Sequence, residues 1–240
     1  MKPSYQDALA FFGMGGAHPG GLALTKRVLG MEQLSGKAKV LDAGCGTGQT
    51  AAFIAKTFNC QVTAIDRHPL MIGQAKKRFA QEGLAVNALR ENIENLSFAD
   101  NSFDYIIAES VIIFTNIEQS LKEIKRVLKP GGIFLDLEMT AEEPLNPQEK
   151  NQIQSVYRIK RLLTEGEWLQ TYTSEGFRSP RTVAANSIYT EIINSPWDQQ
   201  PEIANPHLVN PKYEHILIEH QKLLAIYAER LGYRVYRMQK

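Results

Sequence analysis

The chain has 240 residues, of which 43% are hydrophobic and 22% charged, a balance that excludes disordered and fibrous proteins and predicts one or two domains. The 27 lysines and arginines against 26 acidic residues leave a net charge of +1, so no overall attraction to nucleic acid or to an acidic membrane is expected. No apolar run approaches the roughly 20 residues of a membrane span, no basic-then-apolar leader opens the chain, and the two cysteines are too few for a disulfide framework, so we expect a cytoplasmic protein.

The first 37 residues predict a helical cover. We expect helices over residues 5–12 and 22–29, and the loop between them has four glycines and one proline in the stretch from Gly15 to Gly21. The same loop contains His18. Its composition is equally consistent with a flexible hinge and with a loop that folds over the active site and presents His18 to a substrate.

Residues 38–139 alternate short β-rich runs with longer helical stretches, which is typical of a parallel sheet wrapped by helices. We expect strands over 39–43, 61–65, 84–89, 103–108 and 132–137, and helices over 47–57, 69–82 and 117–128. A sheet of this kind binds its ligand at the carboxyl ends of its strands. The functional residues are therefore expected directly after Ala43, Ile65, Leu89 and Ala108.

Residues 140–240 predict further cover elements and the last strands. We expect a helix over 148–163, a second helix that begins at a capping box of Thr164 and Glu167 and ends at Gly176, and a third helix over 212–231. Strands are expected at 177–187 and 233–237, and a proline-rich loop at 195–211. Trp168 and Phe177 are expected in the core. Four other aromatic residues either line an acceptor pocket or cover the sheet: Tyr5, Tyr157, Tyr189 and Trp197.

A glycine turn follows the first strand of the core. Residues 40–48 read Val-Leu-Asp-Ala-Gly-Cys-Gly-Thr-Gly, and glycines let the backbone approach a ligand closely because no side chain intervenes. The turn lacks the lysine of a phosphate-binding P-loop, and its third glycine comes one residue too early for the dinucleotide fingerprint. Cys45 is expected to be a small packing residue whose backbone N–H faces the ligand, not a nucleophile.

Two acidic residues specify what this turn holds. Asp42 precedes the first glycine, where its carboxylate would repel a pyrophosphate but suits a ligand with a positive charge. Asp66 ends the second strand, where an acid accepts hydrogen bonds from ribose hydroxyls. A ligand with a ribose and a cationic group, and with no need for phosphate, fits S-adenosyl-L-methionine.

Five segments of the core then resemble the class I S-adenosylmethionine-dependent methyltransferases, particularly the small-molecule branch that includes the ubiquinone and menaquinone biosynthesis enzymes. They are LDAGCGTG at 41–48, AID at 64–66, NIENLSF at 92–98, FDYII at 103–107 and RVLKPGG at 126–132. The resemblance implies an α/β fold with a Rossmann-like, doubly wound, mostly parallel seven-stranded sheet and helical cover elements. It also implies a single methyltransferase domain over 1–240, in which 1–37 and 140–240 flank a cofactor-binding core at 38–139.

The resemblance assigns a role to each matching position. Asp42 and the turn of Gly44, Cys45 and Gly46 would contact the methionine part of the cofactor, and Glu109 would lie beside it. Asp66 and the neighbouring Arg67 would lie at the ribose. Asn92 and Ile93 would contact the adenine, although the family more often has Asp at the position of Asn92.

We therefore predict in-line methyl transfer to a small-molecule acceptor, with His18 as the candidate base for a hydroxyl acceptor. Absence of basic clusters, and of an Asn/Asp-Pro-Pro-Tyr motif after Glu109, argues against nucleic acid as substrate. His215 and His220 point about 140° apart on a helix, so no metal site is expected. The alternatives are an aminopropyl-type transferase, a non-catalytic S-adenosylmethionine-binding protein and a dehydrogenase.

Overall fold

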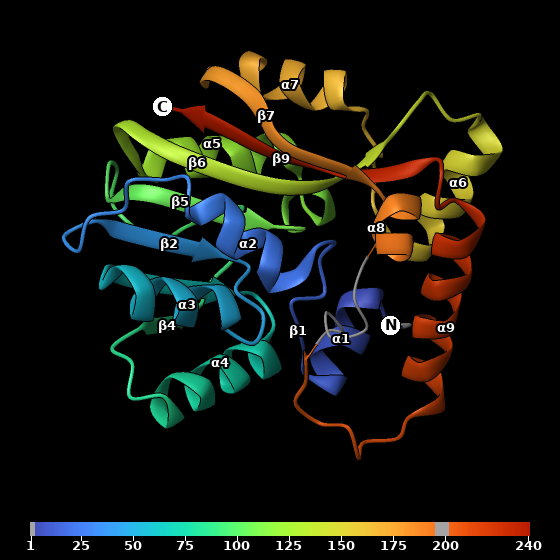
Figure 1. Cartoon of the computed structure of the whole chain (residues 1–240), viewed down its shortest axis with the longest axis horizontal. Coiled ribbons are helices and arrows are strands. Elements are labelled where there is room, and N and C mark those ends of the chain that lie inside the picture. The colour runs from blue at the N-terminus through green and yellow to red at the C-terminus, as the bar shows by residue number, and fades with distance from the viewer. Residues whose placement is uncertain (1–2, 195–201) are drawn as a thin grey trace.

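A seven-stranded sheet forms the centre of the computed structural model, which describes residues 3–194 and 202–240 (Figure 1). The strand order is β4-β3-β2-β5-β6-β9-β7, and β9 runs antiparallel to both of its neighbours while the other pairs are parallel. This arrangement confirms the predicted doubly wound, mostly parallel sheet. The strands are β2 (Lys39–Ala43), β3 (Gln61–Asp66), β4 (Asn87–Arg90), β5 (Phe103–Glu109), β6 (Leu128–Ala141), β7 (Arg178–Ser187) and β9 (Leu231–Gln239).

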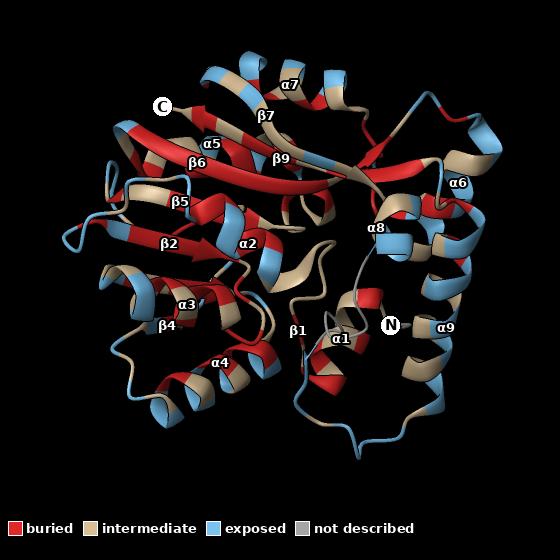
Figure 2. Ribbon diagram, in the orientation of Figure 1, coloured by how far each residue is buried: buried red, intermediate tan, exposed pale blue. Residues whose placement is uncertain are grey.

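Helices cover both faces of the sheet because successive strand residues point to opposite sides and both sides are apolar. Val40 packs with α2 (Gly21–Leu29), α3 (Gln49–Phe58) and α4 (Pro69–Gln81), whereas its neighbour Leu41 belongs to the cluster of α5 (Ile117–Val127) and α7 (Glu165–Ser174). Ile106 and Ile107 divide in the same way. Figure 2 shows the resulting pattern, in which the central strands are buried and the outer helix faces are exposed.

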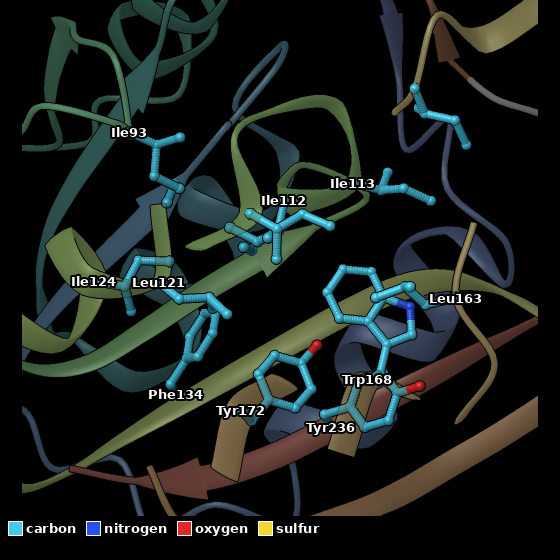
Figure 3. Close-up of a cluster of buried hydrophobic side chains, with 14 of the residues drawn as sticks. Ile93, Ile112, Ile113, Leu121, Ile124, Phe134, Leu163, Trp168, Tyr172 and Tyr236 are labelled. Atoms are coloured by element: carbon cyan, nitrogen blue, oxygen red, sulfur yellow. The ribbon is translucent and has the colours of Figure 1, made fainter. Parts of the chain in front are cut away.

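Large aromatic side chains fill the core under α7 (Figure 3). Trp168 is 0% exposed, stacks on Tyr172 at a centroid distance of 5.5 Å and donates its indole N–H to the Met139 carbonyl at 3.2 Å. Phe177 is 3% exposed. The structure thus confirms Trp168 and Phe177 as core residues, and the capping box of Thr164 and Glu167 opens α7 as predicted.

The cover elements lie beyond the carboxyl ends of β2 to β5 (Figure 1). They are α1 (Tyr5–Phe12), the 3₁₀ turn η1 (Ile112–Phe114), α6 (Pro147–Tyr157), α8 (Ile188–Asn194) and α9 (Pro211–Ile226). A two-stranded sheet of β1 (Met14–Gly15) and β8 (Glu202–Ile203) joins the segment after α1 to the segment before α9. Within the described residues, no helix combines the length and apolarity that a membrane crossing requires.

Several parts of the cover differ from the prediction. The helix expected over 148–163 ends at Tyr157 because Arg158 adopts a left-handed conformation with φ 55°. The helix expected to reach 231 ends at Ile226, and the last strand is longer than predicted. Residues 188–194 form a helix, and 202–203 form a strand inside the predicted loop. Trp197 lies outside the described residues.

Candidate active site

A cavity of about 1000 Å³ lies between the strand ends and the cover. It takes its walls from β2, β3, β5, α1, α6 and α9, and it occupies the edge of the sheet where the sequence places the functional residues. The structure brings every candidate residue to this one cavity: His18, Asp42, Gly44, Cys45, Gly46, Asp66, Arg67, Asn92, Ile93 and Glu109.

The glycine turn connects β2 to α3 through residues with positive φ angles. A Cβ atom on Gly44 would lie 2.3 Å from the Cγ2 atom of Val111, and one on Gly48 would lie 2.7 Å from the ring of Phe79. A Cβ atom on Gly46 would meet nothing within 4 Å. Packing therefore requires glycine at 44 and 48, and Gly46 is the glycine of this turn that faces open space.

Asp66 ties the end of β3 to the same turn. Its two carboxylate oxygens accept hydrogen bonds from the backbone N–H of Gly46 at 3.0 Å and of His68 at 2.7 Å. Burial raises the pKa of Asp66, and these two backbone donors oppose the shift. Each carboxylate oxygen has a further lone pair, so the group can still accept hydrogen bonds from a ligand.

Asp42 has an unpaired carboxylate oxygen at the end of β2. The residue is buried, and its Oδ2 atom has no hydrogen-bond partner among the described residues. Burial raises the pKa of Asp42 well above its usual range, and the negative charge of Glu109 raises it further. A buried carboxylate in this state gains most from a cationic ligand.

Glu109 is fixed by side chains from two helices. The hydroxyls of Thr25 and Thr50 donate to its two carboxylate oxygens at 2.5 and 2.6 Å. The Nε2 atom of His18 lies 3.7 Å from Oε2 of the same carboxylate. In this structure the glycine-rich loop lies against the cavity, and His18 is one of the residues that line it.

Asn92, Ile93 and Arg67 form the part of the wall that follows β3 and β4. Ile93 is buried, and Met71 from α4 lies in the same wall. The Asn92 side-chain oxygen accepts from the backbone N–H of Glu94 at 3.1 Å and retains a second lone pair. Arg67 is exposed, so it lies at the rim of the cavity.

The opposite wall is aromatic and comes from the cover. Tyr5 of α1 packs edge-on against Tyr157 of α6 at a centroid distance of 5.3 Å, and Phe114 lies 6.5 Å from both rings. The Tyr157 hydroxyl forms a 2.8 Å hydrogen bond with Nδ1 of His220 on α9. Tyr5 and Tyr157 therefore line the cavity, whereas Tyr189 is 48% exposed and lies outside it.

Comparison with known proteins decides the family. A family model described as a methyltransferase domain matches residues 40–132. A Bacillus subtilis protein named uncharacterized methyltransferase YodH is 38% identical over 232 residues, which cover 97% of each chain. The chain belongs to the class I S-adenosylmethionine-dependent methyltransferases.

Other relatives of this methyltransferase match the core or the fold. The ubiquinone/menaquinone biosynthesis C-methyltransferase UbiE of Bartonella henselae is 42% identical over 113 residues, which cover 45% of this chain and 44% of UbiE. Phosphoethanolamine N-methyltransferase 2 of Haemonchus contortus, solved in complex with S-adenosyl-L-methionine, superimposes with a TM-score of 0.76 at 20% identity. That likeness covers 99% of this chain and 57% of the nematode chain, and it shows the fold alone.

The cofactor of the methyltransferase is S-adenosyl-L-methionine, and the residues of the cavity fit it. The unpaired carboxylate oxygen of Asp42 suits a cationic ligand, and the open space at Gly46 leaves room for the ligand beside the backbone. When bound, this cofactor supplies an electrophilic methyl group on a sulfonium. The protein aligns the two reactants and excludes water, and such alignment can lower the activation free energy by up to roughly 7–11 kcal/mol.

Proposed function

We propose that this methyltransferase transfers the methyl group to a small, largely apolar acceptor that binds between the cofactor and the aromatic wall. The observation that carries this proposal is the cavity itself, in which the acidic residues and the aromatic residues line one continuous space. Its volume of about 1000 Å³ reaches the upper end of the range typical of small-molecule sites. It therefore has room for a cofactor and a compact acceptor together.

The charge of the chain supports a small molecule over a nucleic acid. A net charge of +1 provides no electrostatic footprint for a phosphate backbone. Buried aromatic side chains at the far wall favour apolar surface on the acceptor. The named UbiE relatives, which are C-methyltransferases of ubiquinone and menaquinone biosynthesis, are consistent with such an acceptor.

We assign the cofactor-contacting roles by their place on the walls. Asp42 and Glu109 bring negative charge to the methionine and sulfonium end, next to the backbone of Gly44, Cys45 and Gly46. Asp66 and Arg67 lie at the ribose, where the remaining lone pairs of the Asp66 carboxylate accept from hydroxyls. The adenine lies against Asn92 and Ile93.

His18 acts as the base when the acceptor atom is a hydroxyl oxygen. Its Nε2 atom lies 3.7 Å from a carboxylate oxygen of Glu109, and its Nδ1 atom lies 3.2 Å from the Pro19 carbonyl. Groups on both sides of the ring fix its orientation. A neighbouring carboxylate also stabilises the imidazolium that forms when the ring takes a proton.

The test is methyl transfer into a mixture of candidate acceptors. The protein is incubated with a small-metabolite extract and S-adenosylmethionine carrying tritium in its methyl group, and the products are separated by chromatography. We expect label in a small molecule that partitions into organic solvent. Label that appears only in protein or nucleic acid would contradict the proposed acceptor class.

The same incubation, together with two binding measurements, separates the rival functions. An aminopropyl-type transferase that used S-adenosylmethionine itself would transfer the 3-amino-3-carboxypropyl group and leave the tritiated methyl group on the adenosine fragment, so label in methylthioadenosine would identify that chemistry. A non-catalytic protein binds S-adenosylmethionine in calorimetry and releases no labelled product. A dehydrogenase raises its melting temperature with NAD and not with S-adenosylmethionine.

A further inference from the structure

Tyr157 and His220 form a polar pair inside the aromatic wall of the cavity. The Tyr157 hydroxyl lies 2.8 Å from Nδ1 of His220, and both residues line the cavity. The ring of Tyr5 on α1 lies 4.7 Å from the imidazole at an interplanar angle of 31°. His220 therefore contacts side chains from both α1 and α6. Apolar side chains line the same cavity: Ile113, Phe114, Met139, Ile188 and Leu224.

The hydrogen bond between the two residues leaves one donor and one acceptor free in either tautomer. If the tyrosine O–H donates to Nδ1, the Nε2–H of His220 and a lone pair on the tyrosine oxygen remain. If the Nδ1–H donates instead, the lone pair of Nε2 and the tyrosine O–H remain. The pair can therefore both give and accept a hydrogen bond without a change of charge.

The surroundings keep this pair neutral. Burial lowers the pKa of His220 to about 4, so the imidazole is uncharged at neutral pH and is a weak base. Burial also raises the pKa of Tyr157, so the hydroxyl keeps its proton. A wall that disfavours an imidazolium also disfavours an ammonium group on the acceptor.

We propose that Tyr157 and His220 are specificity-determining residues that hydrogen-bond an uncharged hydroxyl or carbonyl group of the acceptor. This inference rests on the proposed function, because it concerns the acceptor end of the same cavity. The pair orients the acceptor toward the cofactor through one polar group while the aromatic rings hold its apolar part. His18, at the opposite end of the cavity, remains the candidate base.

The experiment measures binding of three matched probes to protein saturated with S-adenosylhomocysteine: 1-naphthol, naphthalene and (1-naphthyl)methylammonium. One neutral hydrogen bond predicts that 1-naphthol binds roughly 3- to 10-fold more tightly than naphthalene. Each single variant leaves one polar group in place, so the double variant Tyr157→Phe/His220→Leu should bring the two affinities together. His215→Leu is the matched control, because His215 is exposed on the same helix and lies outside the cavity, and it should preserve the ratio.

The ratio of affinities separates recognition from a structural role, since a loosened wall weakens 1-naphthol and naphthalene alike. Equal affinities in the unmodified protein, a ratio kept in the double variant, tightest binding of the ammonium probe, or no binding of any probe would each overturn the inference. Tritium transfer into the metabolite extract is measured with the same proteins. If the proteins label a small product but the ratio of 1-naphthol to naphthalene affinity is the same in the double variant and the unmodified protein, the inference is refuted and the proposed function stands.

Discussion

At the scale of single residues, three carboxylates from neighbouring strand ends dominate the cofactor end of the cavity. Asp66 has two backbone donors and Glu109 two threonine hydroxyls, whereas Asp42 retains an oxygen with no partner among the described residues. The negative charge of Glu109 adds to the burial of Asp42 in raising its pKa. A cationic ligand would relieve the repulsion between the carboxylates of Asp42 and Glu109, so this end of the cavity favours a positively charged group.

Asp66→Asn tests the role assigned to the acid at the end of β3. The amide keeps one oxygen for the backbone but loses the charge that strengthens hydrogen bonds to ribose hydroxyls, so S-adenosylhomocysteine should bind roughly 10- to 100-fold more weakly. Calorimetry measures the change. Asp100→Asn is the control, because that side chain is 68% exposed and lies outside the cavity. Equal affinity of the two variants for S-adenosylhomocysteine would show that Asp66 does not contact the cofactor.

His18→Ala tests the proposed base once the acceptor is identified and shown to carry a hydroxyl. General base catalysis typically contributes about 100- to 10,000-fold, so kcat should fall by a factor in that range while the Kd for S-adenosylhomocysteine changes little. His207→Ala, an exposed histidine outside the cavity, should behave as the unmodified protein. An unchanged kcat for His18→Ala would refute the base role.

Sequence alone locates the residues at strand ends but not those supplied by helix packing. Asp42, Asp66 and Glu109 end predicted strands, so their meeting at one edge follows from the topology of a parallel sheet. Thr25 and Thr50 lie inside helices with no local signal of function. Their contact with Glu109 depends on how α2 and α3 pack on the sheet, which no short motif encodes.

At the scale of elements, the turn between β2 and α3 needs glycine for two different reasons, a positive φ angle and a lack of space for a Cβ atom. Gly44 and Gly46 have φ angles of 81° and 52°, so both disfavour a side chain, but only Gly44 also meets Val111. Gly46→Ala should destabilise the protein by roughly 1–2 kcal/mol from backbone strain alone. Gly44→Ala should cost roughly 2–5 kcal/mol, because overpacking adds to the strain.

Urea denaturation of the two glycine variants measures this difference, and each variant is the control of the other. Equal losses in the free energy of unfolding would mean that the contact with Val111 has no energetic weight. Because Gly46 faces the cavity, its variant should also weaken S-adenosylhomocysteine more than its loss of stability implies.

Most core elements could be predicted closely and the cover elements less so. Among the core strands, β4 begins at Asn87 and not at Leu84, and β6 spans Leu128–Ala141 and not only 132–137. Strand β2 and helix α1 have the predicted bounds because alternation and capping signals are local. Helix α6 ends at Tyr157, six residues before the predicted end at Leu163, because Arg158 adopts a left-handed conformation. The Arg158 guanidinium donates to the carbonyl of Pro3, near the start of the chain. Contacts of that range cannot be read from a local pattern.

At the scale of the whole molecule, the two ends of the chain close the cavity together. Strand β1 pairs with β8, and Glu202 of β8 accepts hydrogen bonds from Gln49 and Arg78 beside the glycine turn. Helix α9 packs on α1 and presents His220 to the cavity. The acceptor end of the site is therefore assembled from segments about 200 residues apart in the sequence.

The burial of His220 predicts a pH dependence of global stability. Its pKa is about 4 in the folded protein against a usual value of 6.5, so the unfolded chain binds the extra proton and stability falls as pH drops from 6.5 toward 4. The full loss is about 3 kcal/mol. Urea denaturation at several pH values should give a shallower slope for His220→Leu over this window. Parallel curves for the two proteins would contradict the assignment.

A crystal structure of the complex with S-adenosylhomocysteine tests the central claim most directly. We expect the adenosyl group in the cavity, with ribose hydroxyls on Asp66, adenine against Ile93, and the sulfur facing the space in front of Tyr5 and Tyr157. A ligand bound outside this cavity, or a sulfur directed away from the aromatic wall, would contradict it.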